Sequence, residues 1–175
     1  WCTNKAWIVN QKVILPISIF YKDYSNTTKI STSAYYHTCN VNLLHDLEKA
    51  FNYLGGAPQT SWDSYDIMRY VEKSEQIKNV RFRYFTVNFF KKGTAHITFT
   101  DENLDTLKKF NIFGSQQKGW LPPSYGKKQY QDMTPEEKSV INEFQGEDDY
   151  RYTLEHADQF IYDPKSSVPL LTQLS

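Results

Sequence analysis

Residues 80–100 restrict the fold of this chain more than any other stretch, because two runs of alternating polar and apolar residues flank Lys91-Lys92-Gly93. Two such runs joined by a few residues that include glycine predict a β-hairpin. Lysine is unfavourable at the positive φ that a two-residue type I′ turn requires, whereas a type I turn on Lys91-Lys92 followed by a left-handed Gly93 suits all three residues. We therefore predict a three-residue loop in which Gly93 is the bulge residue.

This loop determines which side chains share a face, since a shift of one residue in the register exchanges the two faces of a strand. With Phe90 opposite Thr94, one face is wholly apolar and consists of Phe85, Val87, Phe89, Ala95, Ile97 and Phe99. The other face then consists of Tyr84, Thr86, Asn88, His96 and Thr98. His96 is expected opposite Asn88 on this polar face, beside the lysines of the turn.

Segments before and after the hairpin have the periodicity of helices. A stripe at spacings of three and four residues predicts a helix over 40–54, and its members are Leu43, Leu44, Leu47, Ala50, Phe51 and Leu54. A second helix is expected over 60–74, with Thr60 or Ser61 as its N-cap. A short helix over 101–110 follows the hairpin.

The C-terminal third contains one further clear helix signal. Thr134 and Glu137 form a capping box around a proline at the first helical position, which predicts a helix to about Phe144. The preceding stretch 114–130 is rich in Gly, Pro and Lys and is interpreted as an irregular loop. Residues 147–175 are acidic and have no clear period, so they are interpreted as a C-terminal extension, either a strap or a linker.

These elements predict an α+β fold: an antiparallel sheet with a bulged β-hairpin (80–100), packed by three to four helices. The N-terminal "AWIVNQKVILPISIFY" adds two extended segments, of which the second is interrupted by Pro16, and "TKISTSAYY" adds another extended run. A chain of 175 residues is long enough for one domain with its own core. We place that single α+β domain at 1–146 and the acidic extension at 147–175.

Several classes of protein are excluded by what the sequence lacks. No apolar run approaches the roughly 20 residues that span a bilayer, and no signal peptide is recognisable, so a soluble cytoplasmic protein without a membrane partner is expected. Cys2 and Cys39 lie outside any CxxC pattern, which favours free thiols and no metal site. The glycine-rich loops that bind phosphates are missing, and no cofactor is expected. Because the chain begins at Trp1, we expect it to derive from a longer product.

Charge is segregated along the chain although its net value is zero. Residues 78–131 contain ten lysines and arginines against three acidic residues, which predicts a basic face. Exposed aromatic residues interleaved with lysines can stack on unpaired bases while the lysines contact phosphates, and Trp120 lies among such residues. The expected nucleic-acid-binding residues are Arg81, Arg83, Asn88, Lys91, Lys92, His96, Lys118, Trp120, Tyr125, Lys127 and Lys128. Alternatively, the segment "WLPP" (120–123) could be packed against the rest of the domain in a structural role.

His96 is the one candidate for acid–base chemistry, because an unperturbed imidazole titrates near pH 6.5. The candidate catalytic residues are His96, Lys92 and Tyr84. A purely structural role, in which His96 bonds to Asn88 or Thr98, explains the same pattern. Neither a cysteine, a carboxylate nor a second histidine lies close to His96 in the sequence, so no nucleophile–base pair can be named.

The segments "KKGTAHITF", "KKFNIF" and "KGWLPPSYGKKQYQDMTPEEKSVINEFQG" resemble a family catalogued as domain of unknown function 4942. Over roughly residues 80–150 the motifs occur in the order and with the spacing of the family. The segments "KVILPI" and "HDLEKAFNYLGG" resemble the family more loosely. Lys92, Gly93 and His96 fall on a lysine, glycine and histidine pattern of the family, with Ala95 where leucine is common. Members occur in phages and mobile elements of bacteria, often beside an N6-adenine DNA methyltransferase.

The resemblance implies DNA as the partner, together with an adjoining methyltransferase domain. We expect a nucleic-acid-associated accessory or target-recognition module of a mobile-element or phage DNA-modification protein, without catalytic activity of its own. One alternative is a small metal-independent nuclease that uses His96 with Lys92 or Tyr84. Another is a protein-binding or inhibitor module that docks through the acidic tail. The chain lacks a methyltransferase NPPY-type motif, so it cannot itself transfer a methyl group.

Overall fold

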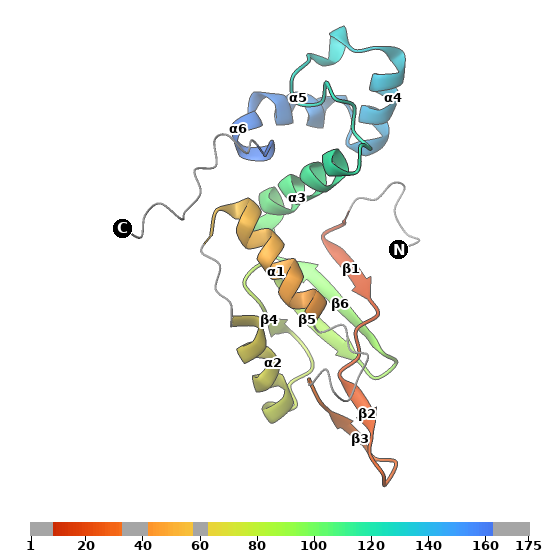
Figure 1. The fold of residues 1–175 in the computed structure, drawn as a ribbon, viewed down its shortest axis with the longest axis vertical. Helices are drawn as coiled ribbons and strands as arrows, with labels where there is room; N and C mark the ends of the chain where they lie inside the picture. Colours follow the sequence, from red (N-terminus) through yellow and green to blue (C-terminus); the bar gives the residue numbers. More distant parts are fainter. Residues whose placement is uncertain (1–8, 33–41, 58–62, 163–175) are drawn as a thin grey trace, which may run out of the picture. The chain divides into compact units, whose positions relative to one another are not determined.

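The computed structural model describes residues 9–32, 42–57 and 63–162 (Figure 1). These residues group into two compact units, the first ending at Leu107 and the second beginning at Lys108. The division falls within one helix, α3 (Leu104–Gln117). The domain limits expected from the sequence, 1–146 and 147–175, stay a prediction.

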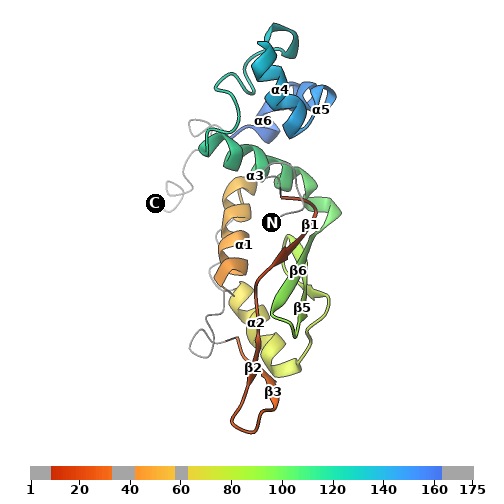
Figure 2. The same cartoon turned by 90° about the vertical axis from the view of Figure 1, so that its right-hand side faces the viewer.

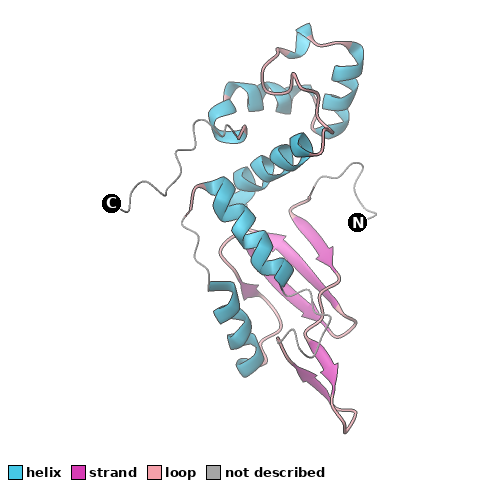
Figure 3. Cartoon of the chain, in the orientation of Figure 1, coloured by secondary structure: helices cyan, strands magenta, loops and turns pink. Residues whose placement is uncertain are grey.

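The first unit contains a four-stranded antiparallel sheet in the order β1-β6-β5-β4. Its strands are β1 (Lys12–Leu15), β4 (Val80–Arg81), β5 (Phe85–Phe90) and β6 (Thr94–Phe99). A separate two-stranded sheet pairs β2 (Phe20–Lys22) with β3 (Thr28–Ile30), as Figure 3 shows. The predicted α+β class with an antiparallel sheet is confirmed. The described residues form six α-helices, where three to four were predicted.

The β5–β6 hairpin has the predicted loop and register. Gly93 has φ +85°, and its N–H donates to the carbonyl oxygen of Phe90 at 2.9 Å. Phe90 pairs with Thr94, and Asn88 pairs with His96. The left-handed glycine therefore ends a three-residue loop and sets the pairing of every residue beyond it.

The apolar face of the sheet is the core of the first unit. Its side chains are 0–1% exposed: Phe85, Val87, Phe89, Ala95, Ile97 and Phe99. Helix α1 (Asn42–Gly55) packs on this face through Phe51, whose ring stacks on that of Phe99 at 5.1 Å between centroids. Figure 2 shows α1 and α2 (Asp63–Ser74) on the same side of the sheet. Neither helix covers the opposite face.

The two helices follow the predicted periodicity. Leu44, Phe51 and Leu54 of α1 are buried, and the helix is followed by Gly56 at φ +66°. The sequence pattern of α2 places Tyr65, Met68 and either Val71 or Tyr70 inward. Met68 and Val71 are buried, whereas Tyr65 is exposed. The N-cap candidates of the second helix, Thr60 and Ser61, lie outside the described residues.

Beyond the hairpin, the helical segment is longer than predicted. A 3₁₀ turn, η1 (Asp101–Asn103), leads into α3, which continues to Gln117 and so includes the first residues of the expected loop. A second 3₁₀ turn, η2 (Tyr130–Asp132), precedes α4 (Pro135–Phe144). Helix α4 begins with the predicted capping box, in which the Glu137 N–H donates to the Thr134 hydroxyl.

The acidic segment after Gly146 forms two helices, α5 (Glu147–Glu155) and α6 (Ala157–Phe160), although no period was found there. The first turn of α5 holds Glu147, Asp148 and Asp149, and carboxylates at that position favour a helix N-terminus. The described part of the segment interpreted as a strap or linker, residues 147–162, is therefore largely helical, and its role as a C-terminal extension stays a prediction. Tyr150 and Thr153 lie on one face of α5 and are buried.

The second unit has its own core, made of Ile112, Leu121, Tyr125, Met133, Ile141, Tyr150 and Phe160. Glu137 attaches the loop before α4 to that helix: its carboxylate accepts from the Ser124 hydroxyl at 2.6 Å and from Lys128 Nζ at 3.2 Å. The Tyr150 hydroxyl donates to the Lys128 carbonyl at 2.6 Å. These bonds order a stretch that its Gly and Pro content marks as irregular.

Replacement of Gly93 tests the hairpin loop. A Cβ there would lie 3.8 Å from Ser18 Cβ, an ordinary contact, so the effect of Gly93→Ala comes from the left-handed backbone. We expect the free energy of unfolding in urea to fall by about 1–2 kcal/mol. Gly114→Ala is the control, because Gly114 is helical with open space around it, and it should stabilise by about 0.5–1 kcal/mol. Equal effects of the two substitutions would contradict the assigned loop.

Glu137 makes the stability of the second unit dependent on pH. Its pKa is lowered from 4.5 to about 2, first by the Ser124 hydroxyl and then by the Thr134 N–H and Lys128. Because the pKa is lower in the folded state, this stabilisation is present above about pH 4.5 and is lost as the pH falls towards 2.

Glu137→Gln should therefore lower the Tm at neutral pH, and its difference from the parent should shrink near pH 3. Thermal unfolding followed by circular dichroism at the two pH values measures this. Glu143→Gln, an exposed position of the same helix, is the matched control and should show no such trend. A Glu137→Gln difference that is constant with pH would refute the assignment.

Candidate functional site

The side of the four-stranded sheet opposite α1 and α2 is named here the outer face. Strand alternation and the pairing register place nine side chains on it: Lys12, Ile14, Arg81, Thr86, Asn88, Phe90, Thr94, His96 and Thr98. Burial alternates accordingly, since every second residue of β5 and β6 is fully buried and those between are partly exposed. The outer face is therefore the predicted polar face of the hairpin, extended by one strand on each side.

One row of side chains crosses the whole outer face. Lys12 pairs with Thr98, Thr98 pairs with Thr86, and Thr86 pairs with Arg81. The two threonines occupy the central strands β5 and β6, while the lysine and the arginine occupy the two edge strands. Long cationic side chains thus border short hydroxyl side chains.

A second row places Ile14 beside His96 and His96 beside Asn88. Ile14 is 54% exposed and adds an apolar side chain to this row. The Asn88 side-chain oxygen accepts a hydrogen bond from the Asn79 N–H at 2.9 Å. The prediction that His96 lies opposite Asn88 is confirmed.

His96 packs against an aromatic ring and lacks one hydrogen bond. Its ring centroid lies 4.3 Å from that of Phe90, with a tilt of 40° between the planes. Its Nε2 atom is buried and has no hydrogen-bond partner among the described residues, and neither has the Thr94 hydroxyl. An unpaired buried nitrogen is unfavourable, so the structural role first considered, a bond to Asn88 or Thr98, is not what holds this nitrogen.

Three lysines from separate segments surround His96. Burial lowers the pKa of His96, and Lys12, Lys92 and Lys78 lower it further in that order. Lys78 also places its ammonium 3.3 Å from the centre of the Phe90 ring, a cation–π contact. The imidazole is therefore neutral at neutral pH and lies in a locally positive field.

Tyr84, a predicted partner of His96, is not on the outer face. The Phe82 N–H donates to the Phe85 carbonyl, so the chain turns at 83–84 and strand alternation begins only at Phe85. Tyr84 is buried beside Phe51 of α1, and its hydroxyl donates to Asn52 Oδ1 at 2.7 Å. Burial raises the pKa of Tyr84, which keeps it protonated. Its assignment to the polar face was wrong.

The predicted nucleic-acid-binding residues of the first unit separate into two groups. Arg81, Asn88 and His96 lie on the outer face, and Lys91 and Lys92 are exposed in the loop at its end. Arg83 instead faces α1, since its guanidinium lies 3.5 Å from Asn52 Oδ1.

The candidates in the second unit behave differently from one another. Lys118 and Lys127 are exposed, and Trp120 is 43% exposed. Tyr125 is only 1% exposed and donates its hydroxyl proton to Gln145 at 2.8 Å, so the expectation that it stacks on bases was wrong. Lys128 is bonded to Glu137.

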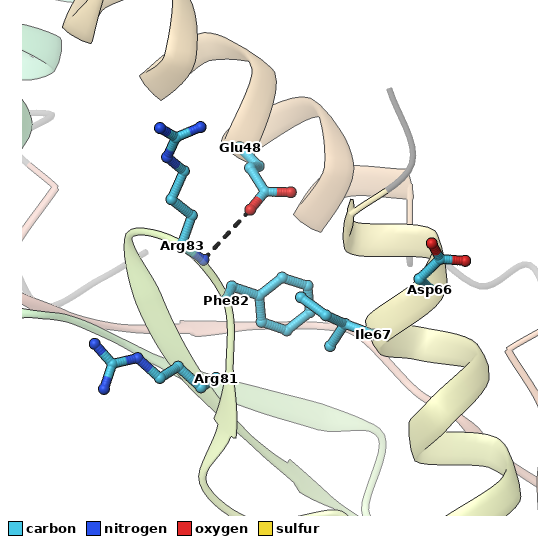
Figure 4. A pocket seen from close by; sticks show the side chains of 6 residues that line it. All are labelled: Glu48, Asp66, Ile67, Arg81, Phe82 and Arg83. Carbon is cyan, nitrogen blue, oxygen red and sulfur yellow. Dashed lines mark hydrogen bonds between the residues drawn. The ribbon is translucent and has the colours of Figure 1, made fainter. Parts of the chain in front are cut away.

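A cleft of about 520 Å³ opens elsewhere in the first unit and is lined by Glu48, Asp66, Ile67, Arg81, Phe82 and Arg83. In Figure 4 the side chains of Phe82 and Ile67 lie between the two helices and the β4 segment, while those of the two arginines point away from them. Glu48 is 3% exposed and accepts from the Arg83 N–H at 3.4 Å. Its lining contains two carboxylates and two arginines, so it has no excess of positive charge for a phosphate.

Two further observations concern the described residues as a whole. They contain no cluster of three or more His, Cys, Asp and Glu side chains placed to hold a metal ion. No helix among them has the length and apolar character needed to cross a membrane.

Comparison with models of known families assigns the chain to one of them. A family model described as a domain of unknown function (DUF4942) matches residues 1–120. The chain belongs to the DUF4942 family. The match includes the whole outer face, whereas the sequence resemblance was strongest over 80–150; residues 121–150 lie beyond the matched range. No curated protein and no solved structure matches this DUF4942 chain.

Four outer-face positions were assigned from the sequence neither to the polar face nor to the candidate site: Lys12, Ile14, Phe90 and Thr94. The alternation of Lys12-Val13-Ile14-Leu15, whose first and third residues are exposed and whose other two are buried, was a usable signal. Which strand lies next to β6 was not readable, because that pairing joins residues far apart in the chain.

Tyr84→Phe tests whether this tyrosine is structural. Loss of the hydroxyl removes the bond to buried Asn52, and we expect the free energy of unfolding to fall by about 1–2 kcal/mol. Tyr70→Phe, at an exposed position of α2, is the control and should change nothing. Urea denaturation of both variants measures the difference. An unchanged midpoint for Tyr84→Phe would show that the bond from Tyr84 to Asn52 does not stabilise the fold.

Proposed function

We propose that this DUF4942 chain is a nucleic-acid-associated accessory or target-recognition module and that the outer face is its binding surface. The observation that carries the proposal is the placement of three lysines around His96. Lys12 is two residues before Ile14, the strand partner of His96. Lys78 rests on the Phe90 ring that contacts His96, and Lys92 is in the loop at the end of the face. The three lysines come from β1, from the segment before β4 and from the hairpin loop.

Charge complementarity supports a polyanion. None of the nine side chains of the outer face is a carboxylate, and the nearest acidic partner, Glu102, contacts Arg81 at 3.3 Å between exposed groups. Exposed ion pairs contribute little, so Arg81 can exchange Glu102 for a phosphate. Lysine and arginine contacts to phosphates supply most of the affinity of such modules, and Asn88 and neutral His96 can hydrogen-bond to base edges.

The family context supports DNA as the target. The resemblance on which the family was first recognised implies bacterial phages and mobile elements, with an N6-adenine DNA methyltransferase beside the domain. In this proposal the methyltransferase performs the chemistry and the present chain supplies nucleic-acid contacts. The adjoining methyltransferase is accordingly proposed as a partner.

A metal-independent nuclease is the second candidate, and His96 is the observation that favours it. A neutral imidazole with an unpaired Nε2 atom, near Lys92, has the groups for proton transfer. Tyr84 no longer contributes, because it is buried against α1. Incubation with DNA and RNA distinguishes the two functions: cleavage that His96→Ala abolishes favours the nuclease, and intact substrate favours the binding module.

The third candidate, a protein-binding module acting through the acidic tail, has less support. Among the described acidic residues at the start of α5, Asp149 pairs with Lys108 and Glu147 pairs with Arg151. Residues 163–175 lie outside the described residues.

Salt titration tests the proposed function. Binding to fluorescein-labelled oligonucleotides, single-stranded and duplex, should weaken as salt rises, with a slope of about −0.7 to −0.9 in log–log form for each phosphate contacted. Lys12→Ala, Lys78→Ala and Lys92→Ala should each reduce that slope by about one contact. Lys73→Ala, at an exposed position of α2, is the control and should leave it unchanged. Absence of salt-dependent binding to every oligonucleotide would exclude the proposal.

A further inference from the structure

We propose that the outer face binds single-stranded nucleic acid in preference to a duplex. This inference rests on the proposed function and specifies its ligand. It is based on three features of the outer face: the width of the sheet, the distribution of cationic side chains around its border, and the ring pair of Phe90 and His96.

The width of the face excludes insertion into the major groove, the duplex mode that distinguishes all four base pairs. Four strands spaced about 4.8 Å apart span ~14 Å between the axes of β1 and β4, before side chains are added. The major groove of B-DNA is about 12 Å wide and admits a two-stranded ribbon or a helix. His96 and Asn88 lie on the two central strands, so β1 and β4 would meet the DNA backbone before either side chain reached a base edge.

The contour of the face suits unpaired bases. The central strands carry three threonines, Asn88 and the ring pair of Phe90 and His96, and no cation. Long cations occupy the border: Lys12 on β1, Arg81 on β4 and Lys92 in the hairpin loop. On such a surface, bases can lie over the central strands β5 and β6 while the phosphates contact the cations at the border. This is the division of roles that single-strand-binding surfaces use.

The central strands also provide a ring surface on which a base can stack. Phe90 and His96 form a ring pair at 4.3 Å, and exposed Ile14 extends the apolar area on the far side of His96. Lys78 now rests on the Phe90 ring. A base stacked on that ring takes the place of the ammonium, which is then available to a phosphate of the same strand.

Two unsatisfied groups lie in the same place. His96 Nε2 and the Thr94 hydroxyl are both without hydrogen-bond partners among the described residues. Base edges carry both donors and acceptors, and neutral imidazole can serve as either through its two tautomers. Both atoms are buried, so a base edge satisfies them only when its binding displaces the side chains that cover them, whereas a phosphate, as an acceptor alone, does so only in part.

The test compares 20-nucleotide probes of one mixed sequence by fluorescence anisotropy with the full chain: single-stranded DNA, single-stranded RNA and duplex DNA. We expect at least tenfold tighter binding to a single strand than to the duplex at equal salt. A preference among the single strands for DNA or RNA identifies the sugar that the face accepts, and both results support the inference.

Two variants locate the preference on the outer face. Phe90→Leu keeps an apolar side chain but removes the ring, and His96→Ala removes its partner; each should weaken single-strand binding about tenfold and duplex binding little. Tyr70→Leu, which removes an exposed ring from α2, is the matched control and should have no effect. Circular dichroism melting verifies that each variant is folded.

The outcomes separate this inference from the proposed function. Salt-dependent binding that is equal or tighter for the duplex, and unchanged by Phe90→Leu, overturns the single-strand inference and leaves the proposed function standing. A single-strand preference that persists in Phe90→Leu and His96→Ala but is lost in Trp120→Leu overturns the assignment to the outer face. Failure of all probes to bind excludes the proposed function itself.

Discussion

The left-handed backbone at Gly93 is the constraint on which the first unit depends. It ends a three-residue loop, and that loop sets the pairing of Phe90 with Thr94 and of Asn88 with His96. A different loop length would exchange the faces of β6, placing its polar residues in the core and its apolar residues in solvent. The division of the sheet into a packed face and an outer face therefore follows from one glycine.

The two faces have different roles. Phe51 of α1 stacks on Phe99, and the apolar side chains around them are almost fully buried, so this face supplies the stability of the first unit. The outer face contributes little packing, which frees its positions for cations, short polar side chains and the pair of Phe90 and His96. A rigid sheet holding ligand-facing side chains is a sound basis for a binding surface, because sites built on strands are more precise than sites on loops.

Aromatic residues show where reading the sequence succeeded and where it failed. The alternation of β5 and β6 identified every buried aromatic residue of the hairpin strands. Tyr84 was placed on the polar face by extending the strand alternation, and Tyr125 was taken for a surface residue because lysines lie near it in the chain. Both are buried with their hydroxyls bonded, to Asn52 and Gln145. A phenol can be packed in a core once its hydroxyl has a partner, and local sequence does not reveal that partner.

The sequence by itself determined the hairpin, its loop, its register and the capping box at Thr134, since each depends on interactions within a few residues. It also indicated the family, through short motifs around the hairpin. Only the tertiary structure decided that β1 lies beside β6, which brings Lys12 and Ile14 to His96. Such pairings join distant parts of the chain and depend on how whole faces pack, so no local pattern contains them.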